Sequence, residues 1–355
     1  MFSISSNGIK EDLVLIFDIQ SGLINGALAS IKKDKTLKII STKTDQIQRK
    51  GHMDGNLYIR FMISTLSNIA HQLAGNHHIS QAHIILSSPW IISKSKTINS
   101  KFDKETSITP KLIDNLIEQA SEKNTFDEDS VYIEKKIFDI KLNGYSVTKY
   151  IDRTAMNIEI AFATTISSNN LLSMIKDAIK RPFSISKIEY HSGLLLNFIS
   201  LRKLITDMND YVYIHIHAEL TDIVIVKNGI CVHISSFPLG ISSLIKKISQ
   251  ELKIDEDMVD STLSVYKDGK FNNEEKNKIN SKLDEYSNDW LNNYSTSIDG
   301  SISRELLPEV VYISSVSHVD IYKGILKSKF SENIHFVDLD VDTMVVHTLA
   351  LSDVI

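Results

Sequence analysis

One stretch near the middle of the chain constrains its fold more than any other. Residues 211–240 read YVYIHIHAELTDIVIVKNGICVHISSFPLG. The alternation of apolar and polar residues from 211 to 217 predicts a strand, because successive side chains of a strand point to opposite faces. The apolar run at 223–226 predicts a strand that is buried on both faces. Asn228-Gly229 predicts a tight turn before a third strand, because both residues tolerate positive φ.

Length and composition limit the class of protein. A chain of 355 residues fits about two domains, and 42% hydrophobic with 23% charged residues is typical of a soluble globular protein. A net charge of -5 argues against a nucleic-acid binder. Cys231 is the single cysteine, which excludes an intrachain disulfide. The sequence has neither a secretory signal nor an apolar run of about 18 residues, so we expect a cytosolic protein.

The rest of the chain predicts alternating strands and helices. Residues 13–31 predict strand, turn and strand, and apolar spacings of three and four predict a helix within 51–75. Thr109-Pro110 predicts a helix start, and His77 and His78 fall in a loop. We also expect strands at 37–42, 82–98, 131–142, 145–151, 156–165, 185–190, 309–317 and 336–339, and helices at 167–181 (ending before Pro182), 193–205, 241–252, 254–298 (two or more), 319–330 and 343–351.

The central stretch resembles the second phosphate-binding hairpin of the actin-like ATPase superfamily. That hairpin reads roughly Asp-Ile-Gly-Gly-Gly-Thr-Thr-Asp, and the same slots hold His215, Ile216, His217, Ala218, Glu219, Leu220, Thr221 and Asp222. The first phosphate loop of the superfamily, Asp-Ile-Gly-Thr-Ser, is matched at Asp18, Ile19 and Ser21, while Gln20 replaces the glycine and Gly22 lies further along. By itself this segment also reads as a plain β-turn with one acidic residue.

Two further motifs of the superfamily can be located. Phe237-Pro238-Leu239-Gly240 resembles the helix start that follows the second hairpin. Ser314 and Ser315 occupy slots of the glycine-rich strand that packs against the adenosine. The segment KKIFDIKLNGYSV is similar to a strand of the SHS2 (1C) subdomain, which identifies the FtsA/PilM branch, although the family's proline is absent.

The resemblance implies an α/β, actin-like (ribonuclease H-like duplicated) two-domain fold with an inserted SHS2/1C subdomain. It covers about residues 13–351. The implied parts are a flexible N-terminus at 1–12, subdomain 1A at 13–81 and 166–205, the SHS2/1C insertion at 82–165, subdomain 2A at 206–240, helical subdomain 2B at 241–305, and the end of 2A with the closing 1A helix at 306–355.

The chemical residues of the superfamily are largely replaced. Asp18 and Asp222 remain, but each lost glycine adds a side chain where the backbone should approach the phosphates. The resemblance therefore implies a pseudo-ATPase whose cofactor is either none or weakly bound ATP/Mg²⁺, with no catalytic residue. A nucleotide-binding, active protein is the alternative.

A metal site is a further alternative. His215 and His217 are two residues apart on one strand, so both rings point to the same face. Asp18, Glu219 or Asp222 is a candidate third ligand, and a pair of hydrogen-bonded histidines that fills the vacated cleft is the other reading. Cys231 lies in an apolar strand, where a buried thiol is usually inert.

PilM and FtsA imply different partners. The chain ends LALSDVI, without the basic amphipathic tail by which FtsA binds membrane, which favours a PilM-like scaffold at the inner face of the membrane. PilM-like proteins bind the cytoplasmic tail of the inner-membrane protein PilN in type IV pilus or type II secretion assembly. An FtsA-like division protein with an FtsZ-like partner, and self-association, remain alternatives; we expect no nucleic acid and only indirect membrane contact.

Overall fold

The computed structural model describes residues 12–32, 37–47, 54–75, 77–121, 128–204, 209–299, 307–315, 317–329 and 335–338. The chain divides into two compact units. The first unit takes Met1–Trp90, Ser167–Ser200 and Asp342–Ile355, and the second takes Ile91–Ile166 and Leu201–Val341.

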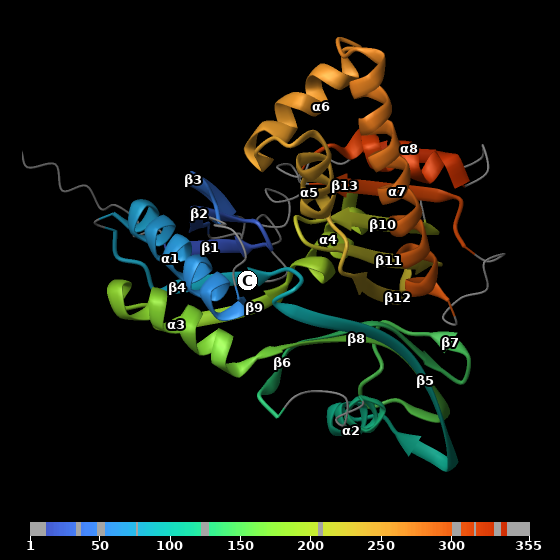
Figure 1. The fold of residues 1–355 in the computed structure, drawn as a ribbon. Helices are drawn as coiled ribbons and strands as arrows, with labels where there is room; N and C mark the ends of the chain where they lie inside the picture. The colour runs from blue at the N-terminus through green and yellow to red at the C-terminus, as the bar shows by residue number, and fades with distance from the viewer. Residues whose placement is uncertain are drawn as a thin grey trace, which may run out of the picture. The chain divides into compact units, whose positions relative to one another are not determined.

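The first unit is built on a five-stranded sheet with the order β3-β2-β1-β4-β9 (Figure 1). Its strands are β1 (Asp12–Ile19), β2 (Leu23–Ile31), β3 (Leu37–Gln46), β4 (Gln81–Leu86) and β9 (Lys187–Ser192). The first three are antiparallel neighbours, whereas β4 runs parallel to both β1 and β9. The strand β9 therefore forms one edge of this sheet.

Helices cover both faces of that sheet. The helices α1 (Gly55–Ala74) and α3 (Asn169–Phe183) contact each other on one face (Figure 1). Gly26 of β2 lies against α1, since a Cβ there would meet Ile69. The helix α4 (Gly193–Leu204) places Leu196 in an apolar cluster with Val14 and Ile85. That cluster also contains Ala27, the neighbour of Gly26, so it lies on the opposite face.

The sheet of the second unit repeats the same strand order, β12-β11-β10-β13-β14. Its strands are β10 (Tyr211–Ile216), β11 (Thr221–Lys227), β12 (Ile230–Phe237), β13 (Val310–Ser315) and β14 (His335–Asp338). Counted along the chain, both sheets place their strands in the order third, second, first, fourth, fifth. This repeat is the topology that a duplicated ribonuclease H-like fold requires, and it confirms the predicted fold class.

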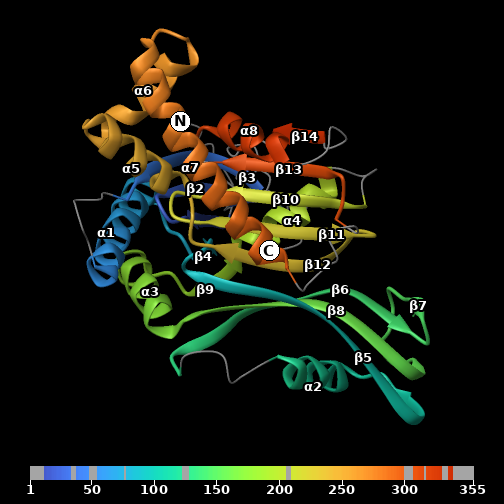
Figure 2. The same cartoon turned by 45° about the vertical axis from the view of Figure 1, so that its right-hand side comes forward.

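One face of the second sheet packs against helices (Figure 2). The helices α5 (Ile241–Leu252), α6 (Val259–Lys267), α7 (Asn273–Ile298) and α8 (Val319–Lys329) contribute to its buried cluster, and the 3₁₀ turn η2 (Glu256–Met258) lies between α5 and α6 in the chain. Ile214, Ile223 and Ile313 of the sheet share a buried cluster with Trp290 of α7 and Tyr322 of α8. Burying a large apolar side chain contributes about 1.5–3 kcal/mol, so this cluster holds the helices on the sheet.

A third, four-stranded sheet lies between β4 and α3 in sequence, with the order β5-β8-β6-β7. Its strands are β5 (Ile91–Ser107), β6 (Ser130–Leu142), β7 (Tyr145–Ser146) and β8 (Thr154–Ser168), and the helix α2 (Pro110–Ala120) lies between β5 and β6 in sequence. Ile113 and Ile117 of α2 pack against Ile140 and Ile158 of the strands, so the helix covers one face of the sheet (Figure 2).

Several local predictions are confirmed. Asn228 and Gly229 have φ of 52° and 71°, as the hairpin turn requires. Thr109 caps α2 by accepting a hydrogen bond from the backbone N of Leu112 at 3.2 Å, with Pro110 in the first turn. Every residue from 221 to 226 in β11 is buried.

Three local predictions are wrong. The predicted strand at 82–98 is two strands, β4 in the first sheet and β5 in the third. The predicted strand at 145–151 ends at Ser146, because the backbone of 152–153 bonds to Ile108 instead. The helix α3 continues through Pro182 to Phe183. Proline so near the end removes only one helical hydrogen bond, and the Phe183 ring meets the His71 ring of α1 edge-on at 4.9 Å.

Of the N-terminus predicted to be flexible at 1–12, Asp12 instead begins β1, and residues 1–11 lie outside the described residues, as does the predicted closing helix at 343–351. None of the described helices has the length and apolar character needed to cross a membrane. The proposed subdomain boundaries stay a prediction.

Candidate functional site: two hairpins with replaced phosphate-binding residues

A row of four polar side chains crosses the sheet of the second unit. His215 on β10 is in register with Asp222 on β11 and with Ser314 on β13, and Asp222 is in register with Ser236 on β12. Residues in register lie on the same face of a sheet. The apolar residues that pack under α5, α7 and α8 are the alternate ones, such as Ile214 and Ile223, so the polar row occupies the other face.

The members of this polar row bond to one another and to their neighbours. The Nδ1 atom of His215 lies 2.6 Å from Oγ of Ser314, which is also 2.9 Å from the hydroxyl of Tyr213. Oγ of Ser236 donates to Oδ1 of Asp222 at 2.5 Å, and Nε2 of His217 lies 2.9 Å from Oδ2 of the same carboxylate. Both oxygens of Asp222 are therefore occupied.

The two histidines lie together, as their spacing predicts. Their ring centroids are 4.1 Å apart with an interplanar angle of 89°. Burial holds the pKa of His215 well below its ordinary value, and the neighbouring His217 lowers it further. The Nδ1 atom of His217 is buried without a hydrogen-bond partner among the described residues. A buried pair of imidazoles thus fills the slots that the first aspartate and the first glycine hold in the superfamily motif.

The start of α5 is closed against the same hairpin. The backbone N–H groups of Ile241 and Ser242 donate to the carbonyls of His217 and Ala218 at 3.1 and 2.8 Å. A Cβ on Gly240 would lie 2.4 Å from the carbonyl oxygen of His217, so the two segments touch backbone to backbone. Free N–H groups at a helix start form an anion site, and two of them are used here within the chain.

Thr221 links the hairpin to the helices behind it. Its hydroxyl donates to the carbonyl of Leu239 at 2.8 Å and accepts from Nε1 of Trp290 at 3.1 Å. Thr221 is fully buried. It therefore acts in this structure as a packing and hydrogen-bonding residue of the core.

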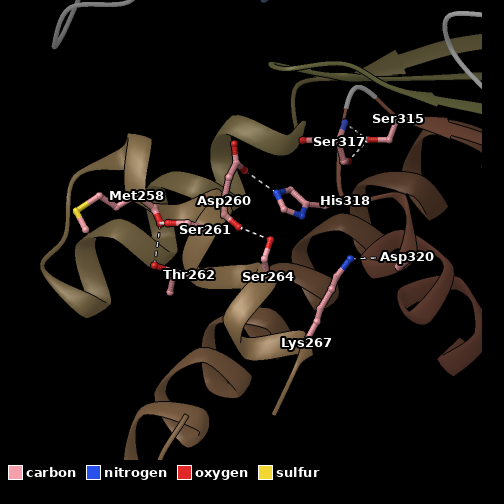
Figure 3. Close-up of polar contacts among 10 residues, drawn as sticks. All are labelled: Met258, Asp260, Ser261, Thr262, Ser264, Lys267, Ser315, Ser317, His318 and Asp320. Carbon is pink, nitrogen blue, oxygen red and sulfur yellow. Dashed lines mark hydrogen bonds and ion pairs between the residues drawn. The ribbon is translucent and has the colours of Figure 1, made fainter. Parts of the chain in front are cut away.

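The adenosine-strand positions at the end of β13 are also engaged. Ser314 belongs to the polar row, and the hydroxyl of Ser315 donates to the carbonyl of Ser317 at 2.6 Å (Figure 3). Beyond them, Nε2 of His318 lies 2.6 Å from Oδ1 of Asp260 on α6. Nζ of Lys267 on α6 lies 3.0 Å from Oδ2 of Asp320 on α8 (Figure 3). Two polar pairs thus connect α6 to the segment that follows β13.

The first hairpin, in the first unit, shows the same self-contained bonding. Oδ2 of Asp18 accepts hydrogen bonds from the side-chain amides of Gln20 at 2.7 Å and Asn25 at 3.2 Å. The side chain of Gln20 therefore sits on the carboxylate that the superfamily motif keeps for the nucleotide. Asp18, Gln20 and Ser21 are all buried.

The backbone of this turn is held by its surroundings. Nε1 of Trp90 donates to the carbonyl of Gln20 at 3.0 Å, and the Tyr58 hydroxyl donates to the carbonyl of Ser21. The carbonyl of Gly22 accepts from the backbone N of Ile47 at 2.9 Å. The rings of Tyr58 and Trp90 stack at 5.8 Å, which places two aromatic side chains beside the predicted phosphate loop.

The candidate residues thus form two groups, one in each unit, and neither resembles a nucleophilic site. Burial raises the pKa of the Cys231 thiol to about 12, so this cysteine stays protonated. Sequence reasoning missed Asn25, Tyr58, Trp90 and Ser236. Asn25 and Ser236 each lie opposite a predicted aspartate, and correct strand register would have found them.

Sequence reasoning also missed a cluster in the first sheet. Among the described residues, His83, Glu189 and His191 are the one group of three metal-ligating side chains whose ligand atoms all lie within 4.8 Å of one another. Among the same described residues, His215 and His217 are not joined by a third ligating side chain at these distances. Burial lowers the pKa of His83, and it lowers that of His191 to about 4. The sequence signal was Glu-x-His on one strand, with a histidine on a neighbouring strand.

No family model and no curated protein sequence matches the chain. Among solved structures, the PilM–PilN type IV pilus biogenesis complex is similar over 95% of this chain and 93% of that one, with a TM-score of 0.61 and 13% identity. Ethanolamine utilization protein EutJ from Carboxydothermus hydrogenoformans covers 98% and 91%, with a TM-score of 0.47 and 10% identity. The cytoplasmic domain of EpsL, an inner-membrane component of the Vibrio cholerae type II secretion system, covers 97% and 95%, with a TM-score of 0.44 and 9% identity. At these identities the similarity concerns the fold alone, and only the PilM–PilN structure among these three has a TM-score above 0.5. The chain thus has an actin-like fold that resembles PilM.

Proposed function

We propose that this chain is a PilM-like scaffold of the actin-like fold, that it does not hydrolyse ATP, and that it binds a short peptide of a partner protein. One observation carries the proposal. His215, His217 and Asp222 in the slots of the second phosphate-binding hairpin are buried and bonded within the chain, His215 to Ser314 of the adenosine strand and His217 to Asp222.

The energetics of this arrangement support a scaffold without nucleotide. Mg²⁺ and phosphates need carboxylate oxygens and backbone N–H groups that can turn toward them. In the second unit Asp222 is bonded through both oxygens, and the N–H groups of Ile241 and Ser242 are bonded to carbonyls. Releasing them would leave buried polar groups such as His217 without partners, at about 1–3 kcal/mol each.

The peptide-binding part of the proposal rests on what the fold is kept for. A fold can retain a binding role after its chemical residues are replaced. One solved structure with a similar fold is that of PilM with PilN, in a type IV pilus biogenesis complex. In this proposal the chain acts in the cytoplasm, beside the inner membrane, and binds the cytoplasmic tail of a PilN-like protein during assembly of a type IV pilus or a type II secretion apparatus.

Titration calorimetry tests the nucleotide part. We expect no heat beyond dilution when millimolar ATP is added to the purified protein, with or without Mg²⁺. The matched variant Asp222→Asn, which keeps the shape of the side chain, should behave identically. Micromolar, Mg²⁺-dependent binding that Asp222→Asn weakens would contradict the proposal.

Fluorescence polarisation tests the partner. The probe is a labelled synthetic peptide with the sequence of a PilN cytoplasmic tail, and a scrambled peptide is the control. We expect saturable binding of the first peptide only, unchanged by ATP. Binding of an FtsZ C-terminal peptide in its place would instead favour the FtsA-like alternative.

A further inference from the structure

Three ligating side chains meet on two neighbouring strands of the first sheet. His83 lies on β4 in register with Glu189 on the edge strand β9, and His191 is two residues further along β9. Because side chains two apart on a strand point to the same face, all three share one face of the sheet. It is the face on which Ile85 packs with Leu196 of α4.

Two distances within this cluster suit ligands of one ion, and all three ligand atoms lie within 4.8 Å of one another. Nδ1 of His83 lies 3.0 Å from Nε2 of His191 and 3.4 Å from Oε2 of Glu189. Zinc binds imidazole nitrogen and carboxylate oxygen at about 2.0–2.2 Å, so two ligands of one ion at angles near 90–110° lie roughly 2.9–3.4 Å apart. The separations of 3.0 and 3.4 Å both fall in that interval.

We propose that His83, Glu189 and His191 bind one divalent transition-metal ion, with Zn²⁺ as the best-suited candidate. Two imidazoles and one carboxylate are a common ligand set for Zn²⁺, and they leave a further coordination position for water. This site is separate from both phosphate-binding hairpins, so it does not depend on the proposed scaffold function.

The surroundings decide how the ion would enter and how it would be held. His83 is buried, while the side chain of Glu189 is 33% exposed and opens the cluster to solvent. The second oxygen of Glu189, Oε1, lies 2.7 Å from Nζ of Lys187, which orients the carboxylate with Oε2 toward the histidines. Ligating carboxylates are commonly oriented by such outer hydrogen bonds.

One atom limits the affinity. Nε2 of His83 is buried without a hydrogen-bond partner among the described residues. Coordination through Nδ1 puts the ring proton on this Nε2 and replaces the contact between Nδ1 of His83 and Nε2 of His191 that the metal-free protein keeps. We therefore expect a moderate affinity for Zn²⁺ rather than that of a closed four-ligand site.

The ion would connect the edge strand to the interior of the sheet. The strand β9 is paired on one side only, and α4 begins at Gly193, directly after it. A shared ion would link β9 to β4 independently of the backbone ladder. Binding to the folded state alone raises stability, so Zn²⁺ should also raise the melting temperature of the first unit.

Calorimetry on chelator-treated, nucleotide-free protein tests the site, with ZnCl₂ as the titrant. We expect one ion per chain. Glu189→Gln, a half-exposed and shape-conserving change, should weaken binding at least tenfold, and His83→Gln should do the same. Co²⁺ in place of Zn²⁺ should give visible absorption bands that are lost in Glu189→Gln.

The matched control is Lys187→Gln, which changes the same strand and the same carboxylate contact but removes no ligand. It should still bind one ion. Absence of Zn²⁺ binding in the wild-type chain overturns the proposal. So does binding that survives Glu189→Gln and His83→Gln but is lost in His217→Ala, because the ion would then sit at the second hairpin. Circular dichroism of each metal-free variant checks that it is folded.

Discussion

Nε2 of His217 lies 2.9 Å from Oδ2 of Asp222, and the two side chains are only 1% and 2% exposed. The pair spans the turn between β10 and β11, where the backbone N of His217 also donates to the carbonyl of Leu220 at 2.8 Å. The turn that carries phosphates in the superfamily motif is therefore fixed here by the chain's own side chains.

Removing the carboxylate of this pair should destabilise the protein. Asp222→Ala leaves His217 and Ser236 without a partner in a buried place, and each buried polar group left unsatisfied costs about 1–3 kcal/mol. Scanning calorimetry should show a melting temperature lower by roughly 6–20 °C. The control Asp268→Ala breaks an exposed pair with Lys270, and such pairs contribute about 0–1 kcal/mol. Equal shifts for both variants would contradict the role given to Asp222.

Gly240→Ala should destabilise the junction between the second hairpin and α5. Its Cβ would lie 2.4 and 2.6 Å from the carbonyl oxygens of His217 and Ala218, and backbone cannot move aside as a side chain can. Overpacking of this kind costs about 1–3 kcal/mol. Gly324→Ala on α8 is the matched control, because its Cβ meets nothing within 4 Å. That change should stabilise the helix by about 0.5–1 kcal/mol, and thermal melts of the two variants should shift in opposite directions.

Acid sensitivity should depend on His215. Burial keeps the pKa of this ring well below its ordinary value, so below about pH 6.5 the unfolded chain binds a proton that the folded chain does not. Stability should therefore fall with decreasing pH from about 6.5, by up to about 1.4 kcal/mol per pH unit for this group. No such loss arises from His215 between pH 7 and 8.

The variant His215→Gln should flatten this dependence, which denaturant unfolding at pH 7 and at pH 5.5 would measure. Ser314→Ala is the control: it removes the hydrogen-bond partner of His215 but leaves the ring buried. It should lower stability about equally at both pH values. An unchanged slope in His215→Gln would mean that other groups govern the acid limb.

Trp290→Phe should weaken the second unit. The indole donates to Thr221, meets the Phe237 ring edge-on at 5.4 Å and stacks on Tyr294 at 5.6 Å. The loss of volume and of this hydrogen bond should cost about 2 kcal/mol. The chain has two tryptophans, so Trp90→Phe is the control that leaves Trp290 as the fluorophore. The fluorescence emission of Trp290 in this variant should be that of a fully buried indole. An emission maximum typical of a solvent-exposed indole would contradict the packing.

Much of the fold could be predicted because its signals are local. The period-two alternation at 211–217 places His215 and His217 on one face whatever surrounds them. Asn228-Gly229 specifies its turn because both residues adopt positive φ. The prediction that the helix ends before Pro182 was wrong. Proline at a helix end removes only one hydrogen bond, and Phe183 packs against His71 of α1.

By itself, then, the sequence determined most of the strands, the turn at Asn228-Gly229, the common face of the two histidines and the replacement of the phosphate-binding residues. The tertiary structure decided what those residues bond to. Ser314 lies 99 positions from His215, and His191 lies 108 from His83. Such partners are set by strand order and register. The sequence of an apolar strand does not show which other strand will pair with it. Only the assembled sheets could therefore show that Asp222 is occupied and that His83, Glu189 and His191 meet.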